Sequence, residues 1–225
     1  MNTPDTFSVL FDFVSGPLLW ATVIVFIAGT IYRIGNLFWL ANRREPFVYT
    51  YLSLTAILRS LAHWLVPFGT TSWRQHPALT VVTFVFHICL VLLPIFLTAH
   101  VVMLNVAWGI DWPTLPAAVA DVLTLVVIAC CAFFLVRRIT QPEVRYLTTP
   151  SDYVLLGIAA APFITGFLAY HQWAGYNFWL ILHILTGELM LVAIPFTRLT
   201  HMLLALFTRS YLASEFGGVR MARDW

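Results

Sequence analysis

The sequence predicts an all-α protein that crosses a membrane several times. Of its 225 residues, 60% are hydrophobic and only 10% are charged, and the mean hydropathy is +0.86. Soluble domains carry roughly a quarter charged residues and about half apolar ones. The chain also contains five apolar stretches near the ~20 residues that a helix needs to cross the hydrocarbon core. These observations exclude a soluble enzyme, a disordered segment and a nucleic-acid-binding module.

The five apolar stretches define the expected spans. We place them at residues 13–32, 77–107, 115–136, 153–170 and 177–207, within a single membrane-embedded domain over residues 1–225. No cation precedes the first span, so it lacks the basic flank of a cleavable signal peptide and is expected to remain in the membrane. The fourth follows Thr149, Pro150, Ser151 and Asp152, residues typical of a helix start. The fifth is longer than the bilayer requires, so its last turns are expected to project into water.

A sixth apolar segment, residues 47–68, is expected to lie on the membrane rather than cross it. It contains Arg59 and His63, and an arginine at the centre of a spanning helix costs ~2.5–3.5 kcal/mol. Its aromatic and leucine residues suit the headgroup zone. The sequence therefore predicts five transmembrane helices plus one interfacial helix on the cytoplasmic face.

The arginines set the expected orientation. All twelve cations are arginines, and with five spans most of them fall on one side, whereas the loops 109–112 and 170–176 contain none. Basic residues favour the cytoplasmic side of a membrane. We therefore expect a multi-pass protein of the bacterial or archaeal cytoplasmic (inner) membrane, with a periplasmic N-terminus and a cytoplasmic C-terminus.

The three cysteines do not point to a redox centre. Cys89, Cys130 and Cys131 lie within apolar stretches, where a thiol packs as a small hydrophobic group. No CxxC or CxxCH motif occurs in the chain, so neither an iron–sulfur cluster nor a covalently attached haem is indicated. We expect these thiols to be buried in the bundle.

Four histidines inside the spans carry the functional prediction. They are His87 and His100 on the second span and His183 and His201 on the fifth. Polar groups within a membrane are costly and usually functional. His183 and His201 are 18 residues apart, which on a continuous helix is five turns on one face, ~27 Å along the axis. Two neutral imidazoles are able to ligate one haem iron.

The antiparallel course of the two spans suggests how these histidines pair. His87 would meet His201 near the cytoplasmic side, and His100 would meet His183 near the outer side, giving two b-type haems. The 13 residues between His87 and His100 turn a straight helix by about 140°, so the two do not share a face. Pro94 lies between them and is expected to kink the helix. The alternative is a haem-free anchor or scaffold subunit whose histidines only join neighbouring helices.

Two segments resemble a known family. RRITQPEVRYLTTPSDY (Arg137–Tyr153) and LHILTGELMLVAIPFTRLTHM (Leu182–Met202) are similar to the γ (cytochrome b) subunit of respiratory nitrate reductase. They also resemble the b-type subunits of sulfate-reducer transmembrane complexes, such as the high-molecular-weight cytochrome c complex, and of membrane-bound heterodisulfide reductase. The similarity runs from about Val81 to Met202. In that family the two histidines of the second span are usually ten residues apart, a position occupied here by Leu97.

The resemblance implies a non-autonomous electron-transfer subunit of a respiratory oxidoreductase complex. Such a subunit carries electrons across the membrane in anaerobic respiration. It links a menaquinone pool or a periplasmic multihaem cytochrome c to a cytoplasmic, heterodisulfide-reductase-like iron–sulfur subunit, alongside other membrane subunits. Arg137, Arg138 and Arg145 would then dock the iron–sulfur partner, although topology alone also accounts for them. A haem conduit without a quinone site is the other possibility.

Two further residues are candidates for quinone or proton chemistry. Glu188 is the only carboxylate in the middle of the fifth span, where desolvation favours its protonated form. It would accept a proton during quinol oxidation, or simply hydrogen-bond a neighbouring helix. His171 lies in the outer loop and would bind a quinone headgroup, replace His100 as a haem ligand, or remain solvated.

Overall fold

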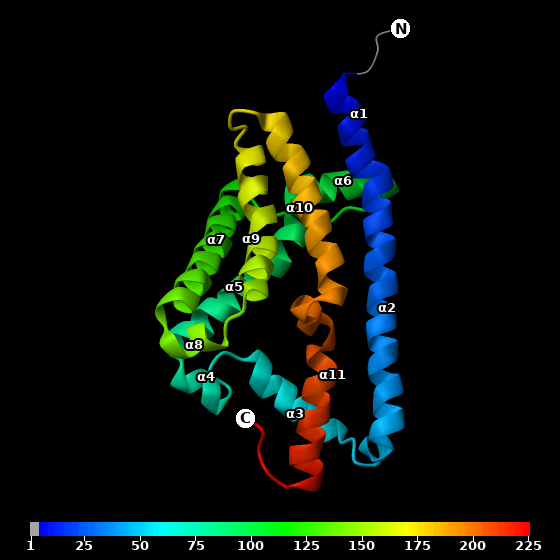
Figure 1. Ribbon diagram of the computed structural model, residues 1–225, viewed down its shortest axis with the longest axis vertical. Helices are drawn as coiled ribbons and strands as arrows, with labels where there is room; N and C mark the ends of the chain where they lie inside the picture. Colours follow the sequence, from blue (N-terminus) through cyan, green and yellow to red (C-terminus); the bar gives the residue numbers. More distant parts are fainter. Residues whose placement is uncertain (1–4) are drawn as a thin grey trace. The chain divides into compact units, whose positions relative to one another are not determined.

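The computed structural model describes residues 5–225, and over that range the chain is built of helices and connecting loops without a strand (Figure 1). Its helices confirm the predicted fold class. Five segments are long and apolar enough to cross a membrane: Thr6–Arg44, Pro77–Phe96, Ala117–Thr140, Pro150–Tyr170 and Tyr176–Phe196. The first of them joins α1 (Thr6–Phe13), a π-helical turn η1 (Val14–Leu18) and α2 (Leu19–Arg44). The others are α5, α7, α9 and α10.

The segment assigned to the membrane surface contains no spanning helix. It forms a 3-10 turn η2 (Pro46–Thr50) and the helix α3 (Leu54–Leu65), which Ser53 caps by accepting a hydrogen bond from the Ala56 amide at 3.3 Å. Twelve residues rise only ~18 Å, too short for the hydrocarbon core. The short α4 (Thr71–Gln75) follows.

Two predicted spans are interrupted. The second is divided into α5 (Pro77–Phe96) and α6 (Thr98–Trp108). The fifth ends at Phe196, and after a 3-10 turn η3 (Arg198–Thr200) the chain continues as α11 (His201–Ser214) and a π-helical turn η4 (Glu215–Val219). The expectation of one continuous helix from 177 to 207 is therefore wrong. His183 and His201 belong to different helices.

The chain divides into two compact units. One contains Val81–Gly187 together with the N-terminal residues as far as Val14, and the other contains Ser15–Thr80 and Glu188–Trp225.

The first unit has its core among α5, α7 (Ala117–Thr140) and α9 (Pro150–Tyr170). Its buried residues are Phe86, Cys89, Leu93, Ala120, Val127, Cys130, Cys131, Ala160 and Phe163. All three cysteines are free and buried, as predicted from their apolar surroundings. α8 (Pro142–Leu147) connects α7 to α9. The start of α9 also follows the prediction, because the Thr149 amide donates to the Asp152 carboxylate at 2.8 Å.

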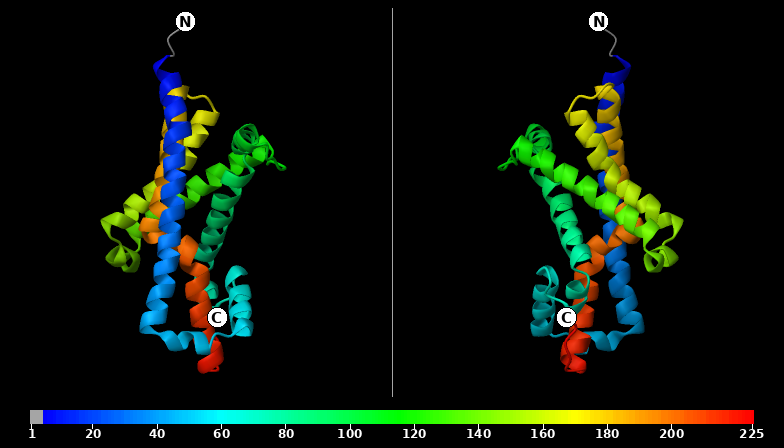
Figure 2. Two further views of the ribbon diagram at one scale, coloured as in Figure 1. Left: turned by 90° about the vertical axis from the view of Figure 1, so that its right-hand side faces the viewer. Right: turned by 90° about the vertical axis from the view of Figure 1, so that its left-hand side faces the viewer.

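The second unit packs α11 along α3 (Figure 2). The Ser53 amide donates to Ser214 Oγ at 3.2 Å, which joins the start of α3 to the end of α11. The Tyr211 hydroxyl donates to Glu45 at the end of α2, 3.0 Å away. Hydrogen bonds of the Tyr211 side chain with Tyr51 and then Glu45 raise the pKa of Tyr211 above its usual range, so the phenol stays protonated at neutral pH.

Within this unit α2 approaches the end of α10 (Tyr176–Phe196) closely at Gly29. A Cβ at Gly29 would lie 2.9 Å from ring atoms of Pro195 and from Phe196 Cζ. Such separations require the neighbours to move, and the rigid pyrrolidine ring moves only with its backbone. The glycine is therefore what allows the two helices to touch.

Replacing Gly29 with alanine is expected to destabilise the protein by about 1–3 kcal/mol, because overpacking forces the two helices apart. A lower Tm of the purified protein in detergent would show the effect. Gly35→Ala is the matched control, since a Cβ there meets nothing within 4 Å and lies on the same helix. Equal melting temperatures for the two variants would contradict this account of the contact.

Candidate haem site

The break in the second span lies beside His100. α5 ends at Phe96, Leu97 adopts an extended conformation (ψ 129°), and α6 begins at Thr98. Pro94 sits in the last turn of α5, where its missing N–H and its ring disfavour a regular helix. Figure 1 shows that α6 turns away from the line of α5. The kink expected from Pro94 is therefore a complete interruption three residues further along the chain.

The interruption leaves the last carbonyl groups of α5 without their usual partners four residues ahead. Each receives a donor from a more distant part of the first unit. The carbonyls of Pro94, Ile95 and Phe96 accept, in that order, from His100 Nδ1 at 3.0 Å, Trp112 Nε1 at 2.9 Å and the Leu115 amide at 2.9 Å. The His100 imidazole is thus one of three groups that complete this helix end, and that hydrogen bond fixes its orientation.

His183 is held in a corresponding way by α9. Its Nδ1 donates to the Pro162 carbonyl at 2.8 Å. The ring lies against the backbone of α9 at Gly166, where a Cβ would be 2.8 Å from its Cε1 and Nδ1 atoms. Because a carbonyl oxygen only accepts, each neutral ring of the two histidines keeps its proton on Nδ1 and its lone pair on Nε2.

The structure brings His100 and His183 together. Their ring centroids are 6.0 Å apart and the ring planes differ by 12°. A bond between a transition metal and an imidazole nitrogen is ~2 Å long, and the centroid lies roughly 1 Å behind that nitrogen. Two imidazoles on opposite sides of one metal ion therefore have centroids about 6 Å apart. Hydrogen bonding of the remaining nitrogen to a carbonyl is typical of histidines that bind metals. The separation of the two rings is compatible with a bis-histidine haem, for which the two Nε2 atoms would have to point toward each other.

His87 and His201 also direct Nδ1 to a backbone carbonyl, but they lie in different units. His87 on α5 directs Nδ1 to the Thr83 carbonyl at 2.7 Å, and His201 at the start of α11 directs Nδ1 to the Arg198 carbonyl at 2.9 Å. Both side chains are exposed. Their pairing therefore stays a prediction from the sequence.

The turn that ends α10 determines the position of His201. The buried Thr200 hydroxyl contacts the carbonyls of Ile194 and Pro195 at 2.8 and 3.0 Å. These contacts satisfy acceptors that lose their helical donors where α10 stops. The chain can then restart as α11 with His201 as its first residue.

Among residues 5–225 no group of three or more His, Cys, Asp or Glu side chains is arranged to hold a metal ion. This finding concerns sites built from protein ligands alone. A haem iron takes its remaining ligands from the porphyrin and needs only the two axial side chains from the protein.

His171 is the C-cap residue of α9, and its side chain contacts Asp121 and Phe167. Its Nε2 lies 3.3 Å from the Asp121 carboxylate on α7, and its ring lies 4.4 Å from that of Phe167. Both members of the His171–Asp121 pair are about one-third exposed. Since the Nε2 that a metal would need faces Asp121, the geometry favours His100 over His171 beside His183.

Glu188 lies on α10, five residues beyond His183. Its side chain is 5% exposed, and its Oε1 has no hydrogen-bond partner among the residues that the structure describes. A buried polar atom without a partner is uncommon and calls for an explanation. A proton acceptor that works only when its reaction partner is bound would supply one.

Comparisons with known proteins place the chain in a family. It is 43% identical over 211 residues to a protein of Nitratidesulfovibrio vulgaris (strain Hildenborough), covering 92% of this chain and 93% of that protein. The chain belongs to the family of that protein. No family model and no solved structure matches it. Membership extends over nearly the whole of both chains, so the relative is expected to share the helix interruptions described above.

Sequence reasoning did not identify several residues that shape the site: Trp112, Asp121, Gly166 and Thr200. The sequence contains a signal for the roles of Trp112 and Thr200. Both residues follow a helix end that contains a proline, and the carbonyl groups at such an end need hydrogen-bond donors. Their partners, however, depend on how the chain turns after each break.

Proposed function

We propose that this protein is a di-haem b subunit that carries electrons across a membrane within a respiratory redox complex. The observation that carries the proposal is the near-parallel pair of imidazoles, His100 and His183, with centroids 6.0 Å apart. The resemblance to nitrate reductase γ-like subunits supports it. His87 and His201 would hold the second haem.

The protein would hold and tune the cofactor rather than transform it. His100 and His183 would hold a haem that supplies one-electron redox chemistry when it is bound. The carbonyls of Pro94 and Pro162 accept hydrogen bonds from Nδ1 of His100 and His183 and so orient the two rings. Both imidazoles are partly buried, and burial together with hydrogen bonding sets the potential of such a site.

Quinol oxidation would also require acceptors for protons. Glu188, whose Oε1 has no hydrogen-bond partner among the described residues, and the His171–Asp121 pair are the candidates. We propose menaquinone as the membrane-soluble partner. A cytoplasmic iron–sulfur subunit and a periplasmic multihaem cytochrome c would be the protein partners, with Arg137, Arg138 and Arg145 docking the iron–sulfur subunit in the cytoplasm. The proposed orientation has the N-terminus in the periplasm of the bacterial or archaeal inner membrane.

The visible spectrum of the purified protein tests the proposal. Expressed in a haem-competent host and reduced with dithionite, the protein is expected to show b-type α-bands from ~two haems per chain. A protein that carries no haem after such expression would instead support the anchor or scaffold function.

A titration with a menaquinone analogue distinguishes the two haem-containing functions. If quinone binds beside His183, the analogue is expected to shift the spectrum or the potential of one haem only. Glu188→Gln should weaken that response while leaving the haem content unchanged. A spectrum that does not respond to the analogue would favour a haem conduit without a quinone site.

A further inference from the structure

A cavity of about 360 Å³ lies in the second unit between the first turns of α3 and the C-terminal segment of the chain. Its polar lining consists of the hydroxyl residues Ser53 and Thr55 and the arginines Arg59 and Arg223, and Trp225 closes part of it. None of these residues belongs to the candidate haem site. The histidine pairs therefore do not explain this cavity.

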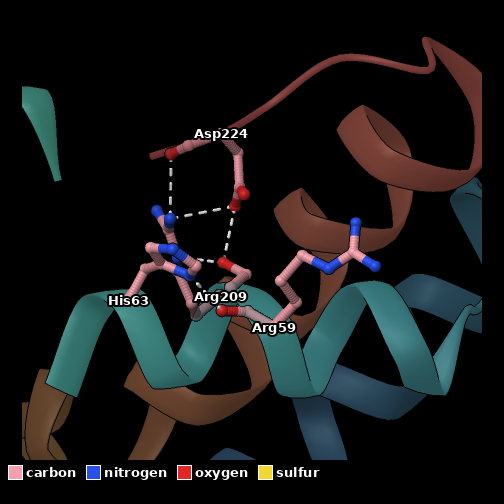
Figure 3. Close-up of polar contacts among 5 residues, drawn as sticks. Arg59, His63, Arg209 and Asp224 are labelled. Atoms are coloured by element: carbon pink, nitrogen blue, oxygen red, sulfur yellow. Dashed lines mark hydrogen bonds and ion pairs between the residues drawn. The ribbon is translucent and has the colours of Figure 1, made fainter. Parts of the chain in front are cut away.

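The C-terminal segment is fixed over α3 by a buried polar network (Figure 3). Arg209 on α11 forms an ion pair with Asp224 at 2.9 Å and donates to Ser60 Oγ at 2.8 Å. Ser60 is fully buried and donates to Asp224 at 2.7 Å. The Trp225 ring stacks on His63 with centroids 4.5 Å apart. These contacts hold the wall of the cavity in place.

Two positively charged side chains line the cavity. Arg209 is neutralised by Asp224, whereas Arg59 and Arg223 form no ion pair within residues 5–225. No Asp or Glu of that described range lines the cavity. Figure 3 shows Arg59 extending from α3 away from the Arg209–Asp224 pair. Two guanidinium groups and neighbouring hydroxyls are the donors that bind a phosphate group with several hydrogen bonds.

The outer surface of α3 indicates that a phosphate bound in the cavity belongs to a lipid headgroup. Leu54, Leu58 and Leu65 are 69%, 58% and 60% exposed, and their spacing places them on one stripe of the helix. An exposed apolar stripe on a short helix beside charged residues is typical of a helix lying in a membrane interface. Arg59 follows Leu58 directly and lies at the flank of the stripe, where an arginine would reach the lipid headgroups.

We propose that this cavity binds the phosphate of an anionic phospholipid headgroup, with Arg59 and Arg223 as its ligands and the leucine stripe of α3 against the acyl chains. The lipid would attach α3 and the C-terminal segment to the membrane surface. The site is independent of the proposed haem function, and its test does not use haem as a readout.

The test measures binding of a labelled phosphatidylglycerol to the full-length protein in phosphatidylcholine nanodiscs. Each arginine near an anionic lipid contributes ~1 kcal/mol, so Arg59→Gln or Arg223→Gln is expected to weaken binding roughly fivefold, and the double variant roughly 30-fold. Arg43→Gln is the matched control. It removes the same charge from an exposed position on α2, over the ring of Trp39 and outside the cavity. It should leave binding near the native level.

Two results would overturn the proposal. A loss of binding in Arg43→Gln equal to that in the double variant would mean that general surface charge, rather than the cavity, attracts the lipid. If inorganic phosphate in detergent raises the Tm of the native protein as much as phosphatidylglycerol does, and the double variant abolishes both effects, the ligand is a soluble phosphate rather than a lipid. The native protein is expected to respond to the lipid alone.

Discussion

His183→Ala is expected to remove one of two low-spin b-type haems, lowering the content from ~two to ~one per chain. The reason is that the His183 and His100 ring centroids are 6.0 Å apart, and the alternative ligand, His171, faces Asp121. His100→Ala should lose the same haem. Because the two side chains would hold one iron, the double variant should lose no more haem than either single variant. Pyridine haemochrome content and the reduced α-band measure the loss.

A matched control is available at His63, whose Nδ1 also faces a backbone carbonyl, that of Arg59, at 2.8 Å. His63 lies on α3 and stacks on Trp225, so His63→Ala should retain both haems. Retention of two haems in His183→Ala would contradict the bis-histidine site. Loss of a haem in His171→Ala with retention in His100→Ala would move the ligand to the end of α9.

Gly166→Ala is expected to have the second-largest effect, although it adds only one methyl group. The new Cβ would lie 2.8 Å from Cε1 and Nδ1 of His183, closer than van der Waals contact permits. The ring would have to withdraw from α9, which would lengthen its hydrogen bond to the Pro162 carbonyl. Loss of that contact should weaken retention of the haem by roughly 10- to 100-fold, the usual effect of removing a partner of a metal-bound histidine.

Gly157→Ala provides the comparison, since it lies on the same helix and a Cβ there meets nothing within 4 Å. It should bind haem like the native protein. Redox titration of both variants separates a changed ligand from general unfolding, because a displaced His183 should shift the potential of one haem while the other keeps its value. Identical titrations for the two glycine variants would show that contact with α9 does not position His183.

The sequence alone determined the number and type of the membrane spans. A bilayer has no water to satisfy backbone groups, so an apolar stretch of sufficient length must be a helix. The polar side chains of Arg59 and His63 also distinguished α3 from the spans, because they interrupt its apolar surface. The beginning of α9 was predictable as well, because Thr149 and Asp152 cap a helix through contacts only three residues apart.

The candidate site was predictable in its residue types but not in its geometry. Imidazoles within apolar helices identified His100 and His183, yet a continuous second span would have turned His100 away from the face of His87. Only the tertiary structure showed that the helix stops at Phe96 and that the freed Pro94 carbonyl holds His100. The position of this break depends on donors supplied by Trp112 and Leu115, which are distant in sequence.

The same physical distinction applies to the whole chain. Span number, caps and apolar faces follow from local hydropathy and hydrogen bonding, which act over one or two helical turns and can be read from neighbouring residues. The contact of His183 with Gly166, the interruption before His201 and the network of Ser60, Arg209 and Asp224 join residues far apart in the sequence. Such contacts exist only after helices have packed, because close approach and the pairing of freed carbonyls are properties of the assembled backbone.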